Sequence, residues 1–247
     1  MDGQKNISEL IKTRNIPQKM FDSQDNSAEI KNKLMRIFLE REIANFQTYL
    51  NILEKELNRV SQEISTRTDD SYIKLNEIKF DEEVNSELIN LIVAKEQAKE
   101  FTNLMRQSFL TSLYSFMELW LVRACRIDSK LRGEGVPNKY KEKEIWKLDE
   151  VREYFSGTMK SNYPFDLNQD WGWINNFRQL RNCIIHRQGS LTGHSDWEIK
   201  PILAEFVTSE NCLSLFGVEN RQIFVEYEFC VKALKTVHRF MVELLSL

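Results

Sequence analysis

The stretch from Ile43 to Ile64, IANFQTYLNILEKELNRVSQEI, decides the fold. Its apolar residues recur in alternating steps of three and four, the spacing of a helix that packs lengthwise against a partner. They are Ile43, Phe46, Leu50, Leu53, Leu57, Val60 and Ile64. No Gly or Pro interrupts residues 28–65, and Ser27 is a suitable N-cap. The sequence therefore predicts one long helix from Ala28 to Ser65.

A second apolar series runs from Val84 to Trp120 and continues to about Ile127, again without Gly or Pro. Between the two series, residues 66–81 lose the apolar spacing and carry polar residues of the kind that favour turns. We therefore expect a linker at 66–81. Two long helices joined by a modest linker are typical of an antiparallel hairpin.

The rest of the chain reads as shorter elements. We expect helices at Lys141–Phe155, at Trp173–Ile184 and from about Tyr227 to the end, with Asn168 or Asp170 capping the second of them and Gly189 and Gly193 ending it. A β-hairpin is expected from Cys212–Phe216, a GVEN turn and Gln222–Val225. Only 8 Gly and 4 Pro occur in 247 residues, too few for a fold with many turns. The fold class is therefore all-α, with one small β-hairpin near the C-terminus.

Charge and cysteine content narrow the function classes. The chain has 34 Lys and Arg against 37 Asp and Glu, which argues against a protein that coats nucleic acid through a general basic surface. The four cysteines show no zinc-ligand spacing and lie mostly among apolar residues, so we expect buried thiols in a reducing compartment. The N-terminal residues MDGQKNISELIKTRN hold no apolar signal region, and no membrane-length apolar run occurs. These features predict a soluble cytoplasmic protein.

The common catalytic motifs are missing, which leaves the three histidines as candidates. His238 is expected on the surface or at the edge of the core, and His194 lies in a Gly-containing loop. His186 differs because polar residues accompany it in FRQLRNCIIHRQG, residues 177–189. At about 100° per residue, Arg178, Asn182 and His186 form one polar row beside a buried apolar stripe.

Arg181 lies on the border between this polar row and the stripe. It is separated from His186 by five positions, or about 140° around an ideal helix, so the two side chains would not meet comfortably. Either the helix loosens near His186, or a second copy of the chain supplies the missing partner. This geometry favours a composite site.

The pattern Arg181-Asn182-x-x-x-His186 resembles the R-x(4–6)-H signature of HEPN domains, in which a polar residue, often Asn, follows the Arg. The upstream segment 109–121 resembles the long first core helix of these domains, with Glu118 at the place of their acidic mid-helix residue. The resemblance covers about residues 95–247 and implies a HEPN-like up-and-down helical bundle. Together with the patterning described above, we expect a polar segment at 1–27, a heptad-patterned helix and linker at 28–81 that would serve as an interaction arm, and a HEPN-like helical domain at 82–247.

The resemblance implies a metal-independent endoribonuclease without cofactor, in which two motifs face each other across a homodimer. RNA carries its own nucleophile, the 2′-hydroxyl, which makes RNA and not DNA the expected substrate. His186 would exchange protons, Arg181 would stabilise negative charge on the phosphorus, and Asn182 would bind phosphate or orient the imidazole. Glu118 would orient Arg181, and Arg178 and Arg187 would add positive field. By analogy, such enzymes act as toxins or defence effectors and are held in check by a partner such as an antitoxin.

A competing hypothesis is a non-catalytic HEPN-like module for interaction or dimerisation. Arg181, Asn182 and His186 would then form a structural cluster that is buried and fully hydrogen-bonded, whereas a nuclease needs His186 partly exposed in a positive cleft. Trp171 and Trp173 could stack on bases, but aromatic residues at the start of a helix more often anchor it in the core.

Overall fold

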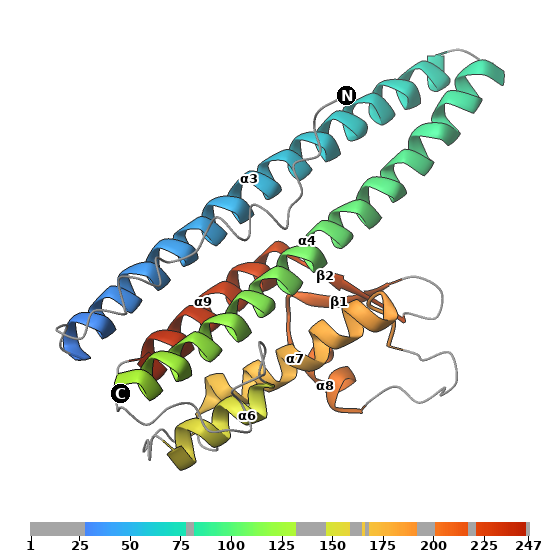
Figure 1. The fold of residues 1–247 in the computed structure, drawn as a ribbon. Helices are drawn as coiled ribbons and strands as arrows, with labels where there is room; N and C mark the ends of the chain where they lie inside the picture. The colour runs from blue at the N-terminus through green and yellow to red at the C-terminus, as the bar shows by residue number, and fades with distance from the viewer. Residues whose placement is uncertain are drawn as a thin grey trace, which may run out of the picture.

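The computed structural model describes residues 28–77, 82–131, 147–158, 165, 168–191, 201–216 and 221–245. Two helices of equal length dominate it: α3 (Ala28–Glu77) and α4 (Glu82–Leu131). Figure 1 shows them as an antiparallel hairpin whose far end projects beyond the other elements. The predicted helical hairpin and the mostly helical fold class are therefore confirmed. Within the described part of the chain, no helix combines the length and the apolar character needed to cross a membrane.

The expected linker at 66–81 was wrong for most of its length, because α3 continues as a helix to Glu77. Thr68 and Ser71 are 4% and 2% exposed, so small polar side chains replace the apolar stripe at this part of the helix. The Thr68 hydroxyl donates to the carbonyl of Ile64, which satisfies it within the helix. No Gly or Pro breaks 66–81 either. Where the apolar spacing stops, the helix therefore continues, and its buried face changes from apolar to small polar side chains.

The C-terminal helix α9 (Tyr227–Leu245) lies beside the hairpin and completes the main core (Figure 1). Its start and its inward face are as predicted, because the expected apolar residues are all buried: Phe229, Ala233, Leu234, Val237, Phe240, Met241 and Leu244. Met35, Leu39 and Leu50 of α3 belong to the same hydrophobic cluster. The described parts of 28–81 and 82–247 thus share one core. Val60 of the predicted α3 stripe is an exception, being 38% exposed.

Shorter elements pack on the other side of α4. They are α6 (Leu148–Glu153) with a π-helical turn η1 (Tyr154–Thr158), then α7 (Gln169–Arg187) and α8 (Pro201–Ser209). Of the helix predicted at 141–155, the first six residues lie outside the described ones. The sequence analysis assigned no helix to 201–209, although Leu203, Phe206 and Val207 are buried there at helical spacing.

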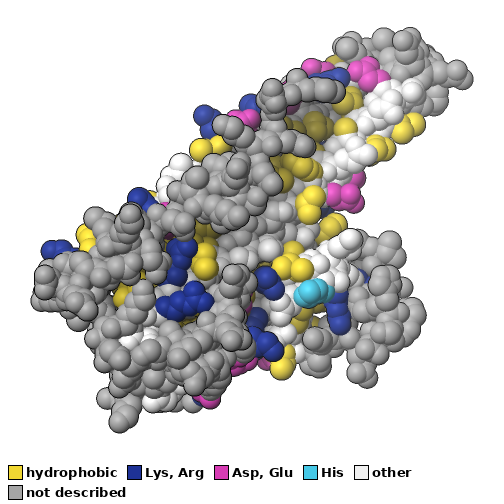
Figure 2. Space-filling model, in the orientation of Figure 1, with side chains coloured by type: hydrophobic (Ala, Val, Ile, Leu, Met, Phe, Trp, Pro, Cys, Tyr) yellow, Lys and Arg dark blue, Asp and Glu magenta, His cyan; other side chains and the backbone are white. Residues whose placement is uncertain are grey.

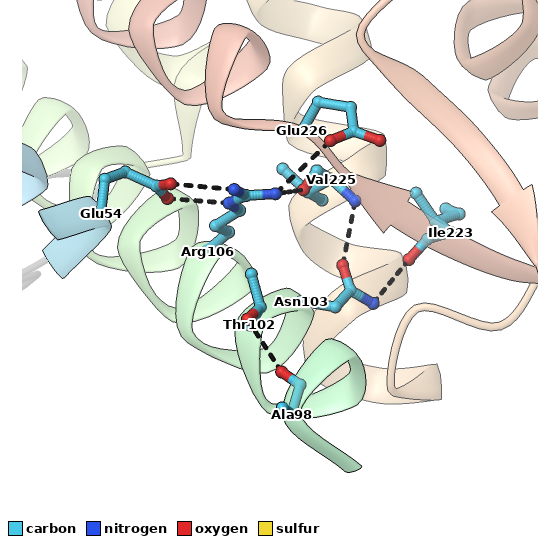
Figure 3. Close-up of polar contacts among 8 residues, drawn as sticks. All are labelled: Glu54, Ala98, Thr102, Asn103, Arg106, Ile223, Val225 and Glu226. Atoms are coloured by element: carbon cyan, nitrogen blue, oxygen red, sulfur yellow. Dashed lines mark hydrogen bonds and ion pairs between the residues drawn. The ribbon is translucent and has the colours of Figure 1, made fainter. Parts of the chain in front are cut away.

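The predicted β-hairpin is confirmed by β1 (Leu213–Phe216) and β2 (Gln222–Val225), which pair antiparallel with Leu213 opposite Val225. Its GVEN turn lies outside the described residues. The side chain of Asn103 on α4 covers the outer edge of β2: its Nδ2 donates to the carbonyl of Ile223 at 3.0 Å, and its Oδ1 accepts from the N–H of Val225 at 2.9 Å (Figure 3). This amide makes the contacts that a third strand would make.

A buried ion pair fastens the hairpin to the same strand. The Nε and Nη2 of Arg106 on α4 donate to the two carboxylate oxygens of Glu54 on α3, at 2.8 and 2.9 Å, and its Nη1 donates to the carbonyl of Val225 at 3.0 Å (Figure 3). The side chains of Arg106 and Glu54 are only 10% and 9% exposed. Burial lowers the pKa of Arg106, but Glu54 more than offsets this and holds the pKa above its ordinary value. Three elements thus meet at one charged residue.

The cysteines are placed as expected. None of the four forms a disulfide, and three of them, Cys125, Cys183 and Cys230, are buried. Burial raises the pKa of the Cys230 thiol, which keeps it in its uncharged form. These residues act as small apolar side chains of the core.

Candidate functional site

The helix α7 carries the candidate motif, and its start is as predicted. The side chain of Asn168 accepts a hydrogen bond from the N–H of Trp171, so Asn168 is the N-cap.

The two tryptophans at the start of α7 pack in the core. Trp171 packs against Phe165 and Phe240. Trp173 packs against Phe206 and Phe229, and its indole N–H donates to Glu210. Their expected role as core anchors is confirmed.

The buried face of α7 determines which residues point outward. Ile174, Phe177 and Leu180 are fully buried, and Cys183 and Ile184 are nearly so. The helix is α-helical throughout Gln169–Arg187, so it does not loosen near His186. The first of the two explanations for the awkward spacing of Arg181 and His186 therefore does not apply. The second, a contribution from another copy of the chain, stays a prediction.

The outward row consists of Arg178, Asn182 and His186. Arg178 is half-buried and its Nη1 donates to Asp149 at 2.9 Å, across to α6. Asn182 is half-buried and accepts from the Nη1 of Arg181 at 3.0 Å. His186 is exposed, and its imidazole has no hydrogen-bond or ion-pair partner among the described residues. Arg178 and Asn182 are thus fixed by side-chain hydrogen bonds, whereas His186 is exposed to solvent.

Arg181 turns away from this row toward α4. Its guanidinium lies 5.6 Å from the centre of the Tyr114 ring, a cation–π contact. Its Nε is buried and has no hydrogen-bond partner within the described part of the chain. No carboxylate of that part lies within ion-pair distance of it. Arg181 interacts through its charge with the carboxyl of Glu118 but forms no direct ion pair with a described residue. A half-buried arginine with one hydrogen bond keeps donors that can bind an anion.

Two ionisable residues of α4, Glu118 and Tyr114, lie near Arg181 and have shifted pKa values. Burial raises the pKa of the Glu118 carboxyl, while the charge of Arg181, contact with Tyr114 and the charge of Arg178 partly offset the rise. Burial also raises the pKa of the Tyr114 hydroxyl, and the charge of Glu118 adds to that shift. Tyr114 was missed by the sequence analysis. Its position one helical turn before Glu118, on the same face, was the available signal.

A hollow of about 250 Å³ opens beside His186. It is lined by Gln179, Asn182, Cys183, His186, Arg187, Leu191 and Leu203. The structure therefore brings Asn182, His186 and Arg187 together at the hollow. Arg178 and Arg181 of α7 do not line it, and Glu118 lies on α4, where its carboxyl interacts with the charges of both arginines. Gln179 and Leu203 were not singled out from the sequence, because nothing local links a residue of α7 to one of α8. Figure 2 shows Lys and Arg side chains near a histidine on the face that is in view.

The other histidines are placed differently. His194 lies outside the described residues. His238 on α9 is one-third exposed, as expected for the edge of the core, and its Nε2 lies 2.9 Å from a carboxylate oxygen of Glu40 on α3. This contact joins two residues far apart in the chain, and neither of them lines the hollow.

Gly189 fixes the exit of the chain from α7. Gln188 and Gly189 have φ angles of 52° and 77°, which turn the backbone out of the helix. The carbonyl of Gly189 accepts from the N–H of Ile223 at 3.0 Å, so the end of α7 is tied to β2. The carbonyl of Ile223 also accepts from Gln107 at 3.2 Å. Ile223 therefore connects the end of α7, beside the hollow, to the hydrogen bonds drawn in Figure 3.

We expect Gly189→Ala to lower the free energy of unfolding by about 1–2 kcal/mol, because a side chain at positive φ is strained. The new Cβ would also lie 2.8 Å from Nε2 of Gln107. Gly172→Ala is the matched control: Gly172 lies in α7 with nothing within 4 Å of an added Cβ, and we expect a gain of about 0.4–1 kcal/mol. Urea unfolding followed by circular dichroism measures both. A Gly189→Ala protein as stable as the Gly172→Ala protein would contradict this account of the turn.

Comparison of the chain with models of protein families, with curated proteins and with solved structures finds no match.

Proposed function

We propose that the protein is a metal-independent endoribonuclease of HEPN type, with its reacting groups on the outward face of α7. One observation carries the proposal: His186 is exposed in a hollow beside Arg187, and Arg181 of the same helix is half-buried with a buried Nε that has no hydrogen-bond partner among the described residues. A structural cluster would have these groups buried and fully hydrogen-bonded. The arrangement is the one expected of a site that receives a phosphate.

The chemistry follows from the residue types. An imidazole accepts the proton of the ribose 2′-hydroxyl, whose oxygen attacks the adjacent phosphorus. A bond forms from the 2′-oxygen to phosphorus, the bond to the 5′-oxygen breaks, and the leaving 5′-oxygen takes a proton from an imidazolium. Arg181 stabilises the charge that develops on the phosphoryl oxygens. The products are a 2′,3′-cyclic phosphate and a 5′-hydroxyl.

The placement of Arg181 and His186 favours a composite site in a homodimer. On one helix they are about 7.5 Å apart along the axis and about 140° apart around it. Arg181 lies toward α4 and His186 beside the hollow. A second chain facing the first would place the Arg181 of one copy opposite the His186 of the other. By analogy with enzymes of this type, we propose a toxin or defence effector that a partner protein restrains.

The test is cleavage of total cellular RNA in EDTA, with analysis of the fragment ends. We expect cutting that leaves cyclic phosphates and 5′-hydroxyls, and no cutting by the folded Arg181→Ala/His186→Ala variant. Cutting that EDTA abolishes, or that the variant retains, would overturn the proposal. Failure of a folded wild-type dimer to cut RNA would favour the alternative, a HEPN-like module for interaction or dimerisation.

A further inference from the structure

Arg181 differs from other arginines of this protein in how it is held. Three arginines donate to carboxylates: Arg106 to Glu54, Arg178 to Asp149 and Arg239 to Asp170. Arg181 instead contacts two uncharged groups, the ring of Tyr114 and the side-chain oxygen of Asn182. A carboxylate partner would neutralise the guanidinium, whereas a ring and an amide orient it and leave its charge in place.

The ring of Tyr114 is itself fixed by the core. Tyr114 on α4 is fully buried, and its ring meets that of Phe177 on α7 edge to face, with 5.5 Å between the ring centres. Phe177 precedes Arg181 by four residues, which is one helical turn. The one ring therefore contacts two successive turns of α7, and close packing leaves it little room to move. It gives the guanidinium of Arg181 a rigid surface to lie on.

Among the described residues, no other group takes over this task. Arg181 donates from Nη1 to Asn182, and its buried Nε has no hydrogen-bond partner in that part of the chain. Glu118 interacts with Arg181 through its charge without forming a direct ion pair. The guanidinium carbon lies 5.6 Å from the centre of the Tyr114 ring, so the ring is the part of Tyr114 that it contacts. Without this ring, one hydrogen bond to the next residue of the same helix would be left to orient the guanidinium.

We propose that Tyr114 is a positioning residue, whose ring holds the guanidinium of Arg181 in place for the phosphate that is cleaved. The inference rests on the proposed function and adds a residue of α4 to the site on α7. Arg181 is the group that touches the phosphate, and Tyr114 acts through it. Because a misplacement of about 1 Å can cost about 10²-fold in rate, loss of the ring should slow cleavage even though Arg181 is still present.

The first test compares three variants by the kinetics of RNA cleavage in EDTA. Tyr114→Phe keeps the ring and should keep kcat within about twofold of the wild type. Tyr114→Leu removes the ring and should lower kcat by about 10–100-fold with KM nearly unchanged, because Arg181 acts on charge that develops in the transition state. Phe109→Leu is the matched control, since Phe109 is a fully buried ring of the same helix that contacts Phe46 and Tyr49 of α3. It should lose stability as Tyr114→Leu does and keep its kcat.

The second test needs no RNA and observes the side chain of Arg181 directly. Relaxation of the ¹⁵N nucleus at Nε, measured by NMR and assigned from the signal that is lost in Arg181→Lys, reports how firmly the guanidinium is held. We expect the Nε of Arg181 to be rigid in the wild type and in Tyr114→Phe, and mobile in Tyr114→Leu. The exposed Arg36 of α3 gives the mobile reference in each protein.

Three results would overturn the inference: an Nε of Arg181 as mobile in the wild type as that of Arg36, an Nε that stays rigid in Tyr114→Leu, and equal losses of kcat in Tyr114→Leu and Phe109→Leu. A loss of kcat in Tyr114→Phe as large as that in Tyr114→Leu would also overturn it, because the hydroxyl and not the ring would then be needed. If Tyr114→Leu fails to fold, the wild-type relaxation and Tyr114→Phe decide.

The outcome is separable from that of the proposed function. If the protein cuts no RNA, the nuclease is removed, and an Nε that becomes mobile without the ring would still show that Tyr114 holds Arg181. Cutting of RNA by a wild type whose Nε is mobile would keep the nuclease and remove the role of Tyr114.

Discussion

Replacing Glu54 by glutamine is expected to lower the free energy of unfolding by about 3–5 kcal/mol, the usual cost of removing one partner from a buried ion pair. Glu54 accepts two hydrogen bonds from Arg106, and both side chains are about nine-tenths buried. Without the carboxylate, Arg106 keeps its charge in the interior. The next acidic group, Glu226, lies 3.5 Å from Nη1 and is 43% exposed, so it compensates only in part. Urea unfolding monitored by circular dichroism gives the free energy.

The matched control is Glu56→Gln, two residues further along α3. Glu56 also pairs with an arginine, Arg59, at 2.9 Å, but both side chains are more than half exposed. We expect almost no loss of stability, because water screens exposed pairs. Similar losses in the two variants would show that the buried pair does not hold the hairpin to β2 as described.

The second large effect concerns catalysis. We expect His186→Ala to reduce the rate of RNA cleavage by about 10²–10⁴-fold, the contribution of a positioned acid or base. The same substitution should leave stability nearly unchanged, because His186 is exposed and has no partner among the described residues. The rate is measured on a labelled RNA in EDTA, and the melting temperature is measured on the same protein.

His238→Ala is the control, and we expect it to affect stability slightly and the cleavage rate not at all. His238 of α9 contacts Glu40 of α3 at 2.9 Å, and neither residue lines the hollow. Its loss should leave the cleavage rate unchanged and lower stability by no more than about 1 kcal/mol, as for an exposed ion pair. Equal losses of activity in the two histidine variants would remove His186 from its proposed role.

Most helices could be predicted because each has a local signal. Asn168 marks the start of α7, and the apolar spacing of α9 gives its inward face. The end of α3 could not be predicted from such a signal. Thr68 and Ser71 pack as small polar residues, so the helix continues where the apolar stripe stops. A spacing rule detects burial of apolar side chains and gives no information on a helix that buries polar ones.

The candidate site also has a part that local sequence predicts and a part that it does not. The row Arg178, Asn182 and His186 could be placed on one face of α7, because it depends only on helical geometry. The contacts that surround it come from other elements: Tyr114 from α4 and Leu203 from α8. The pairing of Arg106 with Glu54 spans 52 positions and that with Val225 spans 119, so no local pattern predicts either. The sequence indicated the proposed reacting groups but not the residues of other elements that surround them.

The contacts of Arg106 can form only in a fixed order while the chain is being synthesised. A ribosome delivers the chain from its N-terminus, so Arg106 can meet Glu54 as soon as α3 and α4 have emerged. The carbonyls of Ile223 and Val225, which accept from Asn103 and Arg106, are made more than a hundred residues later. Only then can Ile223 also bind Gly189 and fix the end of α7. A nascent chain can therefore form the charge-paired hairpin early, whereas the end of α7 is held in place only after β2 has been made.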